Sequence, residues 1–466
     1  MSTETRRAAV IGAGPAGFYA CEDLLKAGFD VDLYDALPTP FGLVRSGVAP
    51  DHPKIKSVTR RYEKTAAHER FRFFGGVELG SDVERDELLQ RYHAVVYAVG
   101  TRDDRRLGIP GEDRPGSHAA TEFVAWYNGH PEYADHAFDL SASRAVVIGN
   151  GNVALDVARM LVLEPDEIAR TDTADHAIEG FMSHGVEHVI VLGRRGPAQA
   201  AFTNPELLEL GELSRCDVIV DPAEVELDEH SAAWLEAEGD KTARRNVEIL
   251  REYAEREPAG KTHRLELRFL RSPLEVLGEE AGDAPVSALR VVRNRIEPDA
   301  SGRLRAVPTG EEETIECGLV LRSIGYRGRP LPGVPFDEAR GLIRNDSGRV
   351  TTEDGRTVPG EYAVGWIKRG PSGVIGTNKK DASETVAKVV EDAENGRLNE
   401  PELPDGDGIE DWLRARVPGL VTWQGWQAID RHEVAQGEPH GRPRVKLVRV
   451  PHMLAVAEQQ RLAPRS

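Results

Sequence analysis

Short apolar runs and amphipathic stretches alternate along the first part of the chain. Residues 8–12 form an apolar run that predicts a buried strand, and residues 15–27 carry apolar side chains at helical spacing. The next apolar run, residues 31–34, ends at Asp35. Strand, helix and strand together span about 30 residues, which is the usual size of a βαβ unit.

The same order of elements recurs near the middle of the chain. A strand is predicted over residues 144–149 and a helix over residues 152–163. The following strand, residues 186–192, comes only after a polar insert. Two such units predict an α/β fold with two Rossmann-like dinucleotide-binding domains.

The segments between and after these units are less regular. We expect a helix near residues 55–67 and a strand that ends in residues 94–100. Apolar and polar positions alternate in residues 265–270 and 288–292, which predicts antiparallel strands there. The part from Arg397 onward mixes proline, glycine and charge, and no regular element is assigned to it.

A glycine-rich loop joins the first predicted strand to the first predicted helix. Its sequence, residues 12–17, is GAGPAG, and these glycines permit a tight turn and a close approach of backbone amides to a pyrophosphate. Asp35 follows at the end of the next strand, where a carboxylate accepts hydrogen bonds from ribose hydroxyls and repels a 2′-phosphate. The loop therefore predicts a site for FAD or NAD. The predicted contacts are Gly12, Gly14, Pro15, Ala16, Gly17 and Asp35.

A second loop, residues 149–154 with the sequence GNGNVA, repeats the pattern after the second strand. At the end of the following strand, Arg194 and Arg195 stand where the first unit has its acid. Two guanidiniums can hold a 2′-phosphate through charge-assisted hydrogen bonds, so this site should prefer NADP. The first site is then assigned to FAD. Arg105 is predicted as a further phosphate contact, with a plain surface arginine as the alternative.

Composition narrows the function classes. Hydrophobic residues make up 40% of the chain and charged residues 29%, which suits large buried cores, and no apolar run approaches the ~20 residues of a membrane span. The net charge of −19 argues against nucleic-acid binding. The first apolar strand follows a short polar stretch without a hydrophobic signal core, which favours a cytoplasmic protein, with a mature organellar chain as the alternative.

The three cysteines, Cys21, Cys216 and Cys317, lie far apart in the sequence. They give neither a redox-active pair nor the ligand spacing of a zinc site or an iron–sulfur cluster. This argues against a disulfide reductase such as thioredoxin reductase, and it predicts no metal site. Any iron–sulfur centre in the reaction should belong to a separate protein.

Longer blocks around the two loops resemble the adrenodoxin-reductase-like ferredoxin–NADP reductases, including their bacterial members. The resemblance covers almost the whole chain. Its most specific blocks are residues 38–45 (PTPFGLVR), 47–53 (GVAPDHP), 193–197 (GRRGP) and 365–371 (GWIKRGP). One departure is Asp35, where the family often has glutamate; the shorter acid keeps the charge.

The resemblance implies a set of cofactor contacts. The implied FAD contacts are Pro15, Asp35, Leu43, Leu79, Trp366, Gly373, Val374 and Ile375. The implied NADP contacts are Asn150, Gly151, Asn152, Val153, Arg194, Arg195 and Glu206.

The resemblance also implies residues close to the reacting rings. His52 and Asp156 would lie near the flavin and the nicotinamide, and Glu209 would be a third member of this group. From the residues alone, His52 reads as a turn residue and Asp156 as a helix residue with a packing or capping role. Hydride transfer itself is carried by the cofactors.

These observations predict an FAD-dependent ferredoxin–NADP(+) reductase that passes electrons from NADPH to a separate ferredoxin or related small iron–sulfur protein. We expect the FAD-binding domain to comprise residues 1–105 and 326–466, the latter with a C-terminal extension, and an inserted NADP-binding domain to comprise residues 106–325. The resemblance favours a monomer. The alternatives are a flavin subunit similar to that of glutamate synthase and a redox-silent NADP-binding interaction protein.

Overall fold

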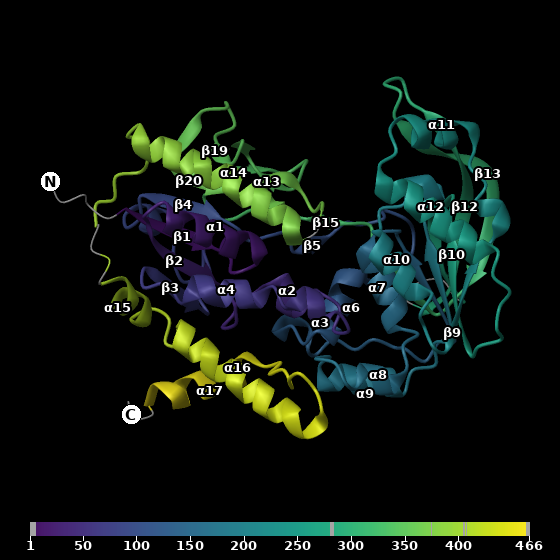
Figure 1. Cartoon of the computed structure of the whole chain (residues 1–466), viewed down its shortest axis with the longest axis horizontal. Helices are drawn as coiled ribbons and strands as arrows, with labels where there is room; N and C mark the ends of the chain where they lie inside the picture. Colours follow the sequence, from purple (N-terminus) through teal and green to yellow (C-terminus); the bar gives the residue numbers. More distant parts are fainter. Residues whose placement is uncertain (1–5, 280–283, 374, 404–405, 407, 463–466) are drawn as a thin grey trace. The chain divides into compact units, whose positions relative to one another are not determined.

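A computed structural model describes residues 6–279, 284–373, 375–403, 406 and 408–462 (Figure 1). The chain divides into two compact units. Unit 1 comprises Met1–Val48, His52–Arg105 and Gly325–Ser466, and unit 2 comprises Ala49–Asp51 and Arg106–Ile324. Most of unit 2 is therefore inserted in the sequence of unit 1. The three residues Ala49–Asp51, which come earlier in the chain, also belong to unit 2.

Unit 1 contains a seven-stranded mixed sheet in which five successive strands, ending at one edge, are parallel and the other two are antiparallel. The strand order is β18 (Asn345–Asp346), β19 (Arg349–Thr351), β20 (Thr357–Ala363), β4 (Ala94–Tyr97), β1 (Arg7–Ile11), β2 (Asp30–Asp35) and β3 (Phe71–Gly75). Side chains alternate across β1, since Ala8 and Val10 enter one apolar core while Ala9 and Ile11 enter another. The sheet is therefore covered on both faces, which is why the inner strands β1 and β4 are almost wholly apolar.

Helix α1 (Pro15–Lys26) lies beside the long helix α14 (Ile375–Glu394) on one face of this sheet. The helix expected near residues 55–67 is broken into α3 (Pro53–Lys56) and α4 (Thr59–Ala66). The remaining elements of unit 1 are α2 (Leu43–Ser46), α5 (Arg85–Leu89), β5 (Asp103–Asp104), β15 (Tyr326–Arg327), β16 (Phe336–Asp337), β17 (Leu342–Ile343), α13 (Trp366–Arg369), α15 (Ile409–Arg414), α16 (Trp423–Gly437), η4 (Glu438–His440) and α17 (Val450–Leu462).

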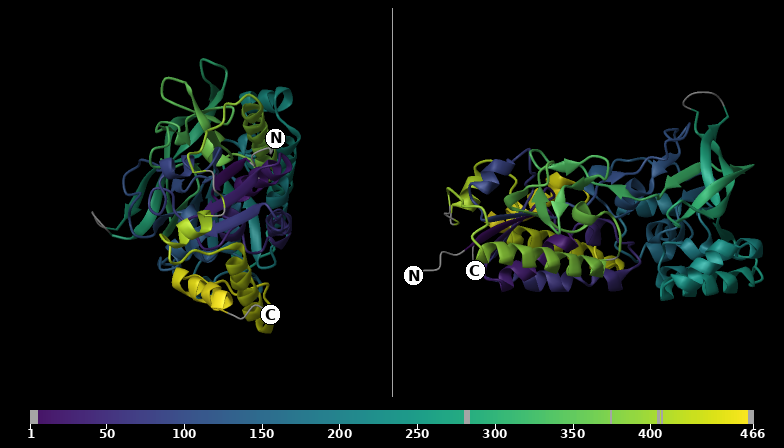
Figure 2. Two further views of the ribbon diagram at one scale, coloured as in Figure 1. Left: turned by 90° about the vertical axis from the view of Figure 1, so that its left-hand side faces the viewer. Right: turned by 90° about the horizontal axis from the view of Figure 1, so that it is seen from above.

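The C-terminal part, to which the sequence assigned no element, contains two sizeable helices. Helices α16 and α17 lie side by side (Figure 2). Trp426 on α16 is buried, and its ring meets the ring of Phe41 edge-on with 5.5 Å between centroids. The C-terminal helices are thereby part of the unit 1 core.

Unit 2 contains a six-stranded parallel sheet. Its strand order is β6 (Ser117–Ala119), β14 (Leu319–Arg322), β7 (Arg144–Ile148), β8 (His188–Leu192), β10 (His263–Arg268) and β9 (Cys216–Val220). Helices cover one face of this sheet. The other face packs on a three-stranded antiparallel sheet of β11 (Arg271–Gly278), β12 (Val286–Pro298) and β13 (Leu304–Glu316).

Unit 2 has seven α-helices among its described residues, together with three short 3₁₀ turns. The helices are α6 (Ala120–Tyr127), α7 (Asn152–Met160), α8 (Pro165–Ile168), α9 (Asp175–Met182), α10 (Asn204–Leu210), α11 (Glu229–Ala237) and α12 (Lys241–Ala254). The 3₁₀ turns are η1 (Pro131–Tyr133), η2 (Pro197–Gln199) and η3 (Pro222–Glu224).

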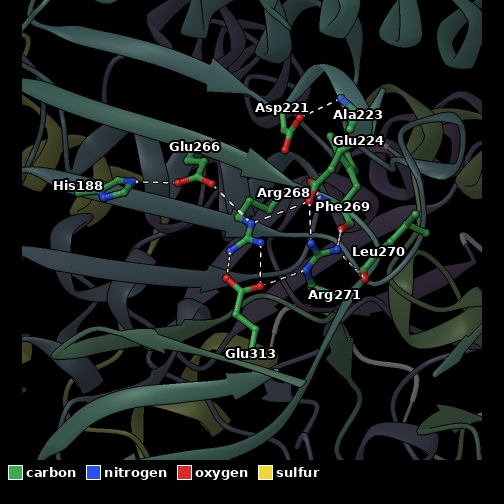
Figure 3. A network of polar contacts seen from close by, with 10 residues as sticks. All are labelled: His188, Asp221, Ala223, Glu224, Glu266, Arg268, Phe269, Leu270, Arg271 and Glu313. Atoms are coloured by element: carbon green, nitrogen blue, oxygen red, sulfur yellow. Dashed lines mark hydrogen bonds and ion pairs between the residues drawn. The ribbon is translucent and has the colours of Figure 1, made fainter. Parts of the chain in front are cut away.

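The prediction of an antiparallel strand at residues 265–270 is wrong. Strand β10 lies between β8 and β9 and runs parallel to both. Its alternation has another cause, since Leu265 and Leu267 enter the apolar core while Glu266 and Arg268 belong to a network of charged side chains (Figure 3). The antiparallel strand expected at residues 288–292 is confirmed within β12.

Candidate functional sites

The first glycine loop makes a tight turn at the end of β1. Gly12 has a φ of +110° and donates its N–H to the carbonyl of Tyr34 at 2.8 Å. A Cβ at Gly12 would lie 2.5 Å from the carbonyl oxygen of Ala98, and one at Gly17 would lie 2.0 Å from the carbonyl oxygen of Gly12. Gly14 differs, because a Cβ there would meet no described atom within 4 Å. Two glycines thus serve the fold, and the third faces open space suited to a ligand.

Asp35 connects this loop to the end of β2. Its carboxylate accepts one hydrogen bond from the N–H of Ala13 at 2.7 Å and another from the N–H of Leu37 at 2.9 Å. Burial raises the pKa of Asp35, while these two hydrogen bonds oppose the rise. Each oxygen retains lone pairs for a ribose hydroxyl. The charge and the rigid position suit a dinucleotide without a 2′-phosphate.

Other segments of unit 1 approach the same loop. A Cβ at Gly42 would lie 2.9 Å from the Cα of Gly14, and one at Gly365 would lie 2.6 Å from the Cβ of Ala16. The blocks at residues 38–45 and 365–371 therefore meet the glycine loop in space, although they are more than 300 positions apart in sequence.

Trp366 begins α13, directly after Gly365. Its indole Nε1 is buried and donates to no described residue. A buried N–H without an acceptor is costly unless a ligand completes it. This orphaned donor beside the glycine loop fits a bound FAD.

The remaining predicted FAD contacts lie in different settings. Leu79 is buried, whereas Leu43 is 40% exposed. Gly373 has a φ of +77°, and Ile375 begins α14. Val374 lies outside the described residues. Arg105 is exposed and donates through Nε to the carbonyl of Tyr326 at 3.2 Å; its phosphate role stays a prediction.

The second glycine loop follows β7 with the same geometry. Gly149 has a φ of +137°, and a Cβ there would lie 2.0 Å from the carbonyl oxygen of Ser323. A Cβ at Gly151 would meet no described atom within 4 Å. The Nδ2 of Asn150 is buried and donates to no described residue, and the Oδ1 of Asn152 accepts from the N–H of Thr203 at 2.8 Å. Unit 2 thus repeats the open glycine and the orphaned donor found in unit 1.

Arg194 and Arg195 follow β8, and they differ in surroundings. Arg194 is exposed, whereas Arg195 is half-buried and lines a cavity of about 770 Å³. Thr203, Trp234 and Arg303 line the same cavity. Burial lowers the pKa of Arg195, and the charge of Arg194 adds to this. A bound anion would relieve both effects, so the pair is suited to a phosphate.

Arg159 on α7 joins the two carboxylates that the resemblance singled out. The guanidinium donates to both carboxylate oxygens of Asp51, at 2.7 and 3.0 Å, and to Asp156 at 2.9 Å. Its Nη1 lies 3.4 Å from the carboxylate of Glu209. Burial lowers the pKa of Arg159, but the hydrogen bonds with Asp51 and the surrounding negative charges raise it above its usual range.

Sequence reasoning missed Arg159, which is only 3% exposed. The signal was the spacing of Asp156 and Arg159, three positions apart on a predicted helix, where opposite charges can pair. His52 is buried and immediately precedes α3 in unit 1, whereas Asp51 belongs to unit 2. Glu206 lies in the first turn of α10, and Val153 in the first turn of α7.

The three cysteines are buried, free thiols. Burial raises the pKa of Cys21, and it raises the pKa values of Cys216 and Cys317 to about 12. A thiol with a raised pKa is a poor nucleophile, which disfavours disulfide exchange. Over the described parts of the chain, no cluster of His, Cys, Asp and Glu is arranged to hold a metal ion, and no helix has the length and apolar content to cross a membrane.

Comparison with known proteins gives consistent matches. Residues 6–194 match the pyridine nucleotide-disulphide oxidoreductase family. The chain is 51% identical over 461 residues to NADPH-ferredoxin reductase FprA of Mycobacterium tuberculosis (strain H37Rv), covering 96% of this chain and 98% of the relative. It is 40% identical over 462 residues to the mitochondrial NADPH:adrenodoxin oxidoreductase of Arabidopsis thaliana, covering 96% and 94%.

The solved structures agree with these sequences. The structure of Mycobacterium tuberculosis FprA in complex with NADPH superposes with a TM-score of 0.91 at 50% identity, covering 97% of this chain and 100% of that one. The predicted α/β class, with two Rossmann-like domains, is thereby confirmed. The chain belongs to the adrenodoxin-reductase-like family of NADPH–ferredoxin reductases.

Proposed function

We propose that this protein is an FAD-containing ferredoxin–NADP(+) reductase that carries electrons from NADPH to a separate iron–sulfur protein of the ferredoxin type. The observation that carries the proposal is the contrast between its two dinucleotide loops. The first is followed by Asp35 and the second by Arg194 and Arg195. One chain therefore offers one site that repels a 2′-phosphate and one that attracts it.

We assign the FAD site to unit 1. Gly14 leaves room for the pyrophosphate at the start of α1, and Asp35 is placed to accept from the ribose. Trp366 would donate its buried Nε1 to the cofactor. When bound, FAD accepts a hydride from the nicotinamide and passes electrons onward one at a time, which suits a one-electron iron–sulfur acceptor.

We assign the NADP site to unit 2. Gly151 leaves room for the pyrophosphate at the start of α7, and Arg195 lines the cavity that would receive the 2′-phosphate. The buried Nδ2 of Asn150 would donate to the nucleotide. Asn152 uses its side chain to hold Thr203, so its role is to shape the loop.

We propose that His52, Asp156 and Glu209 act close to the reacting rings. The guanidinium of Arg159 donates to Asp156 and lies 3.4 Å from the carboxylate of Glu209. Asp51, immediately before His52, is held by the same guanidinium. The role of Arg159 is therefore to position these groups.

The names of the relatives support the choice of donor and acceptor for this chain, namely NADPH and ferredoxin. We further propose that the protein acts as a monomer in the cytoplasm, where NADPH is available. Gel filtration and cell fractionation test these two points separately from the activity.

The test of the activity uses the purified full chain reconstituted with FAD. The protein should be yellow, and it should reduce ferricyanide or cytochrome c with NADPH. A colourless protein that does not bind added FAD would contradict the proposal and would favour a redox-silent NADP-binding role. Activity with NADPH that requires a glutamate-synthase partner would favour a flavin subunit of that class.

A further inference from the structure

The loop that carries the two arginines is held through successive backbone carbonyls. We call residues 193–195 the arginine loop. The carbonyl of Gly193 accepts from the N–H of Arg271 at 3.0 Å, and the carbonyl of Arg195 accepts from the N–H of Leu270 at 3.2 Å. Both donors lie at the connection between β10 and β11. The two ends of the arginine loop are therefore fixed by main-chain hydrogen bonds.

The carbonyl between them is held by a side chain. Asn294 on β12 is 2% exposed, and its Nδ2 donates to the carbonyl of Arg194 and to the Oγ of Ser272, both at 2.8 Å. The N–H of Asn294 donates to the carbonyl of Leu270 at 2.8 Å. The side-chain amide of Asn294 thus connects the arginine loop to β11, and its backbone N–H contacts the β10–β11 connection.

Two features of Asn294 point to a role beyond simple packing. The pairing of β12 with β13 is irregular between Val292 and Asn294, and such bulges redirect side chains. The Oδ1 of Asn294 is buried and accepts from no described residue. An unsatisfied buried oxygen lowers stability, so an apolar residue would serve the core better unless the Nδ2 contacts matter.

The β10–β11 connection is itself braced by charged side chains (Figure 3). Arg271 lies 3.1 Å from Glu224 and 3.5 Å from Glu313, and it donates to the carbonyls of Phe269 and Leu270. These contacts hold Leu270 at a φ of +54°, a conformation that leucine rarely adopts. The donors that fix the arginine loop are therefore on a rigid support.

We propose that Asn294 is a positioning residue that sets the selectivity for 2′-phosphorylated nucleotides by fixing the backbone of the arginine loop. This inference rests on the proposed contact of Arg194 and Arg195 with the 2′-phosphate. Two long side chains lose rotamer freedom when they bind an anion. A loop whose backbone is already fixed adds no further ordering cost, so binding is tighter.

The experiment measures the binding of two probes to the FAD-loaded protein by titration calorimetry. The first probe, 2′,5′-ADP, carries the 2′-phosphate, and the second, 5′-AMP, lacks it. In Asn294→Ala, the Kd for 2′,5′-ADP should rise about tenfold, as for the loss of one buried hydrogen bond, while the Kd for 5′-AMP changes less than about twofold. The KM for NADPH should rise in parallel, with little change in kcat.

Ser272→Ala is the matched control. It removes the second acceptor of the Asn294 Nδ2 but leaves the bond to the carbonyl of Arg194. We define discrimination as the Kd for 5′-AMP divided by the Kd for 2′,5′-ADP. The discrimination of Ser272→Ala should equal that of the unmodified protein. If Asn294→Ala does not fold, Asn294→Ser replaces it, because the shorter side chain cannot hold both partners.

The double variant Arg194→Gln/Arg195→Gln separates the failure of this inference from that of the proposed phosphate contact. Its discrimination between the probes should fall sharply, and adding Asn294→Ala should reduce it no further, because the two changes act on one interaction. If the double variant discriminates between the probes as well as the unmodified protein does, the phosphate contact itself is contradicted. If discrimination falls in the double variant but is unchanged in Asn294→Ala, only the role of Asn294 is overturned.

Discussion

At the residue scale, we propose that the acidic side chain of Asp35 decides which dinucleotide the first site can bind. Asp35 holds two backbone amides of its own unit and still presents negative charge to the place where a ribose would lie. The sequence predicted this residue because it stands at the end of β2. What the sequence did not indicate is that Asp35 also fastens the glycine loop through Ala13.

Replacing Asp35 tests this double role. Asp35→Ala should weaken FAD binding by roughly 1.5–3 kcal/mol, the usual cost of losing hydrogen bonds to a charged group. Asp35→Glu keeps the charge and should retain most of the FAD. The measurement is the Kd for FAD by flavin fluorescence quenching. Equal FAD affinity in the unmodified protein and Asp35→Ala would contradict the assigned ribose contact.

Arg159 is the residue whose importance was least visible in the sequence. Long-range pairing with Asp51, 108 positions earlier, depends on the fold and has no local pattern. Asp156 and Glu209 were singled out by resemblance, and the structure shows that one buried cation lies against both. Buried cations of this kind cannot be recognised until their partners are known.

Arg159→Met should be strongly destabilising. It removes the buried guanidinium that contacts the carboxylates of Asp51 and Asp156, and breaking a buried ion pair by removing one partner costs about 3–5 kcal/mol. Thermal unfolding monitored by circular dichroism should show a clear fall in Tm. Arg245→Met, at an exposed arginine on α12, is the control and should leave the Tm unchanged. Equal Tm values for the two variants would mean that the ion pairs of Arg159 with Asp51 and Asp156 do not stabilise the fold.

At the scale of elements, the glycines of the two loops fall into two groups: some are required by backbone packing, and others leave space for a ligand. Gly14 and Gly151 have negative φ angles, and a methyl group added to either would meet no described atom within 4 Å. A methyl group at Gly17 would instead lie 2.0 Å from the carbonyl oxygen of Gly12. Gly14→Ala should therefore fold normally and lose FAD affinity by about 1–3 kcal/mol through overcrowding of the pyrophosphate. Gly151→Ala should do the same for NADPH alone.

The control for these variants is Gly17→Ala, whose methyl group would collide with the carbonyl of Gly12. This variant should lower the Tm as well as the FAD content. Fluorescence titrations with each cofactor, beside melting curves, distinguish the three variants. Full FAD affinity in Gly14→Ala would show that the pyrophosphate does not lie at this loop.

A second element-scale prediction concerns acid stability in unit 2. Burial, followed by the charge of Arg215, lowers the pKa of His184 from 6.5 to about 4. Its Nδ1 accepts from the N–H of Val186, which also opposes protonation. Because the pKa is lower in the folded state, the unfolded chain takes up the proton first. Stability from this residue is complete above pH 6.5 and is lost as the pH falls toward about 4.

His184→Asn should reduce the loss of thermal stability on acidification. Asparagine can still accept from Val186 but does not titrate. The Tm of the unmodified protein should fall between pH 6.5 and about 4 more steeply than that of the variant. The measurement is Tm against pH at constant ionic strength. Parallel curves for the two proteins would contradict the lowered pKa.

The sequence predicted the elements best where local pattern and fold agree. The strand at residues 8–12 and the helix at residues 15–27 correspond to β1 and α1 within about one residue. It failed for β10, because charged residues that are covered by an ion network alternate like residues facing solvent. It missed α16, whose buried face is set by contacts such as Trp426 with Phe41.

At the scale of the whole molecule, the two units share a plan, and we propose that they differ in their selectivity for a 2′-phosphate. Each has a sheet with at least five parallel strands, a glycine loop between one of these strands and a helix, one glycine that faces open space, and one buried donor without an acceptor among the described residues. The three cysteines are buried free thiols with raised pKa values, which disfavours an internal disulfide as the electron acceptor. An acceptor outside this chain, as the ferredoxin in the names of the relatives indicates, fits this arrangement.

The most direct test of this account is an anaerobic rapid-mixing experiment with the FAD-loaded protein. NADPH should bleach the flavin absorbance much faster than NADH at equal concentration, and subsequent addition of an oxidised ferredoxin should restore it. Equal rates with both nucleotides would contradict the arginine site. A flavin that NADPH bleaches but ferredoxin cannot reoxidise would contradict the proposed electron transfer.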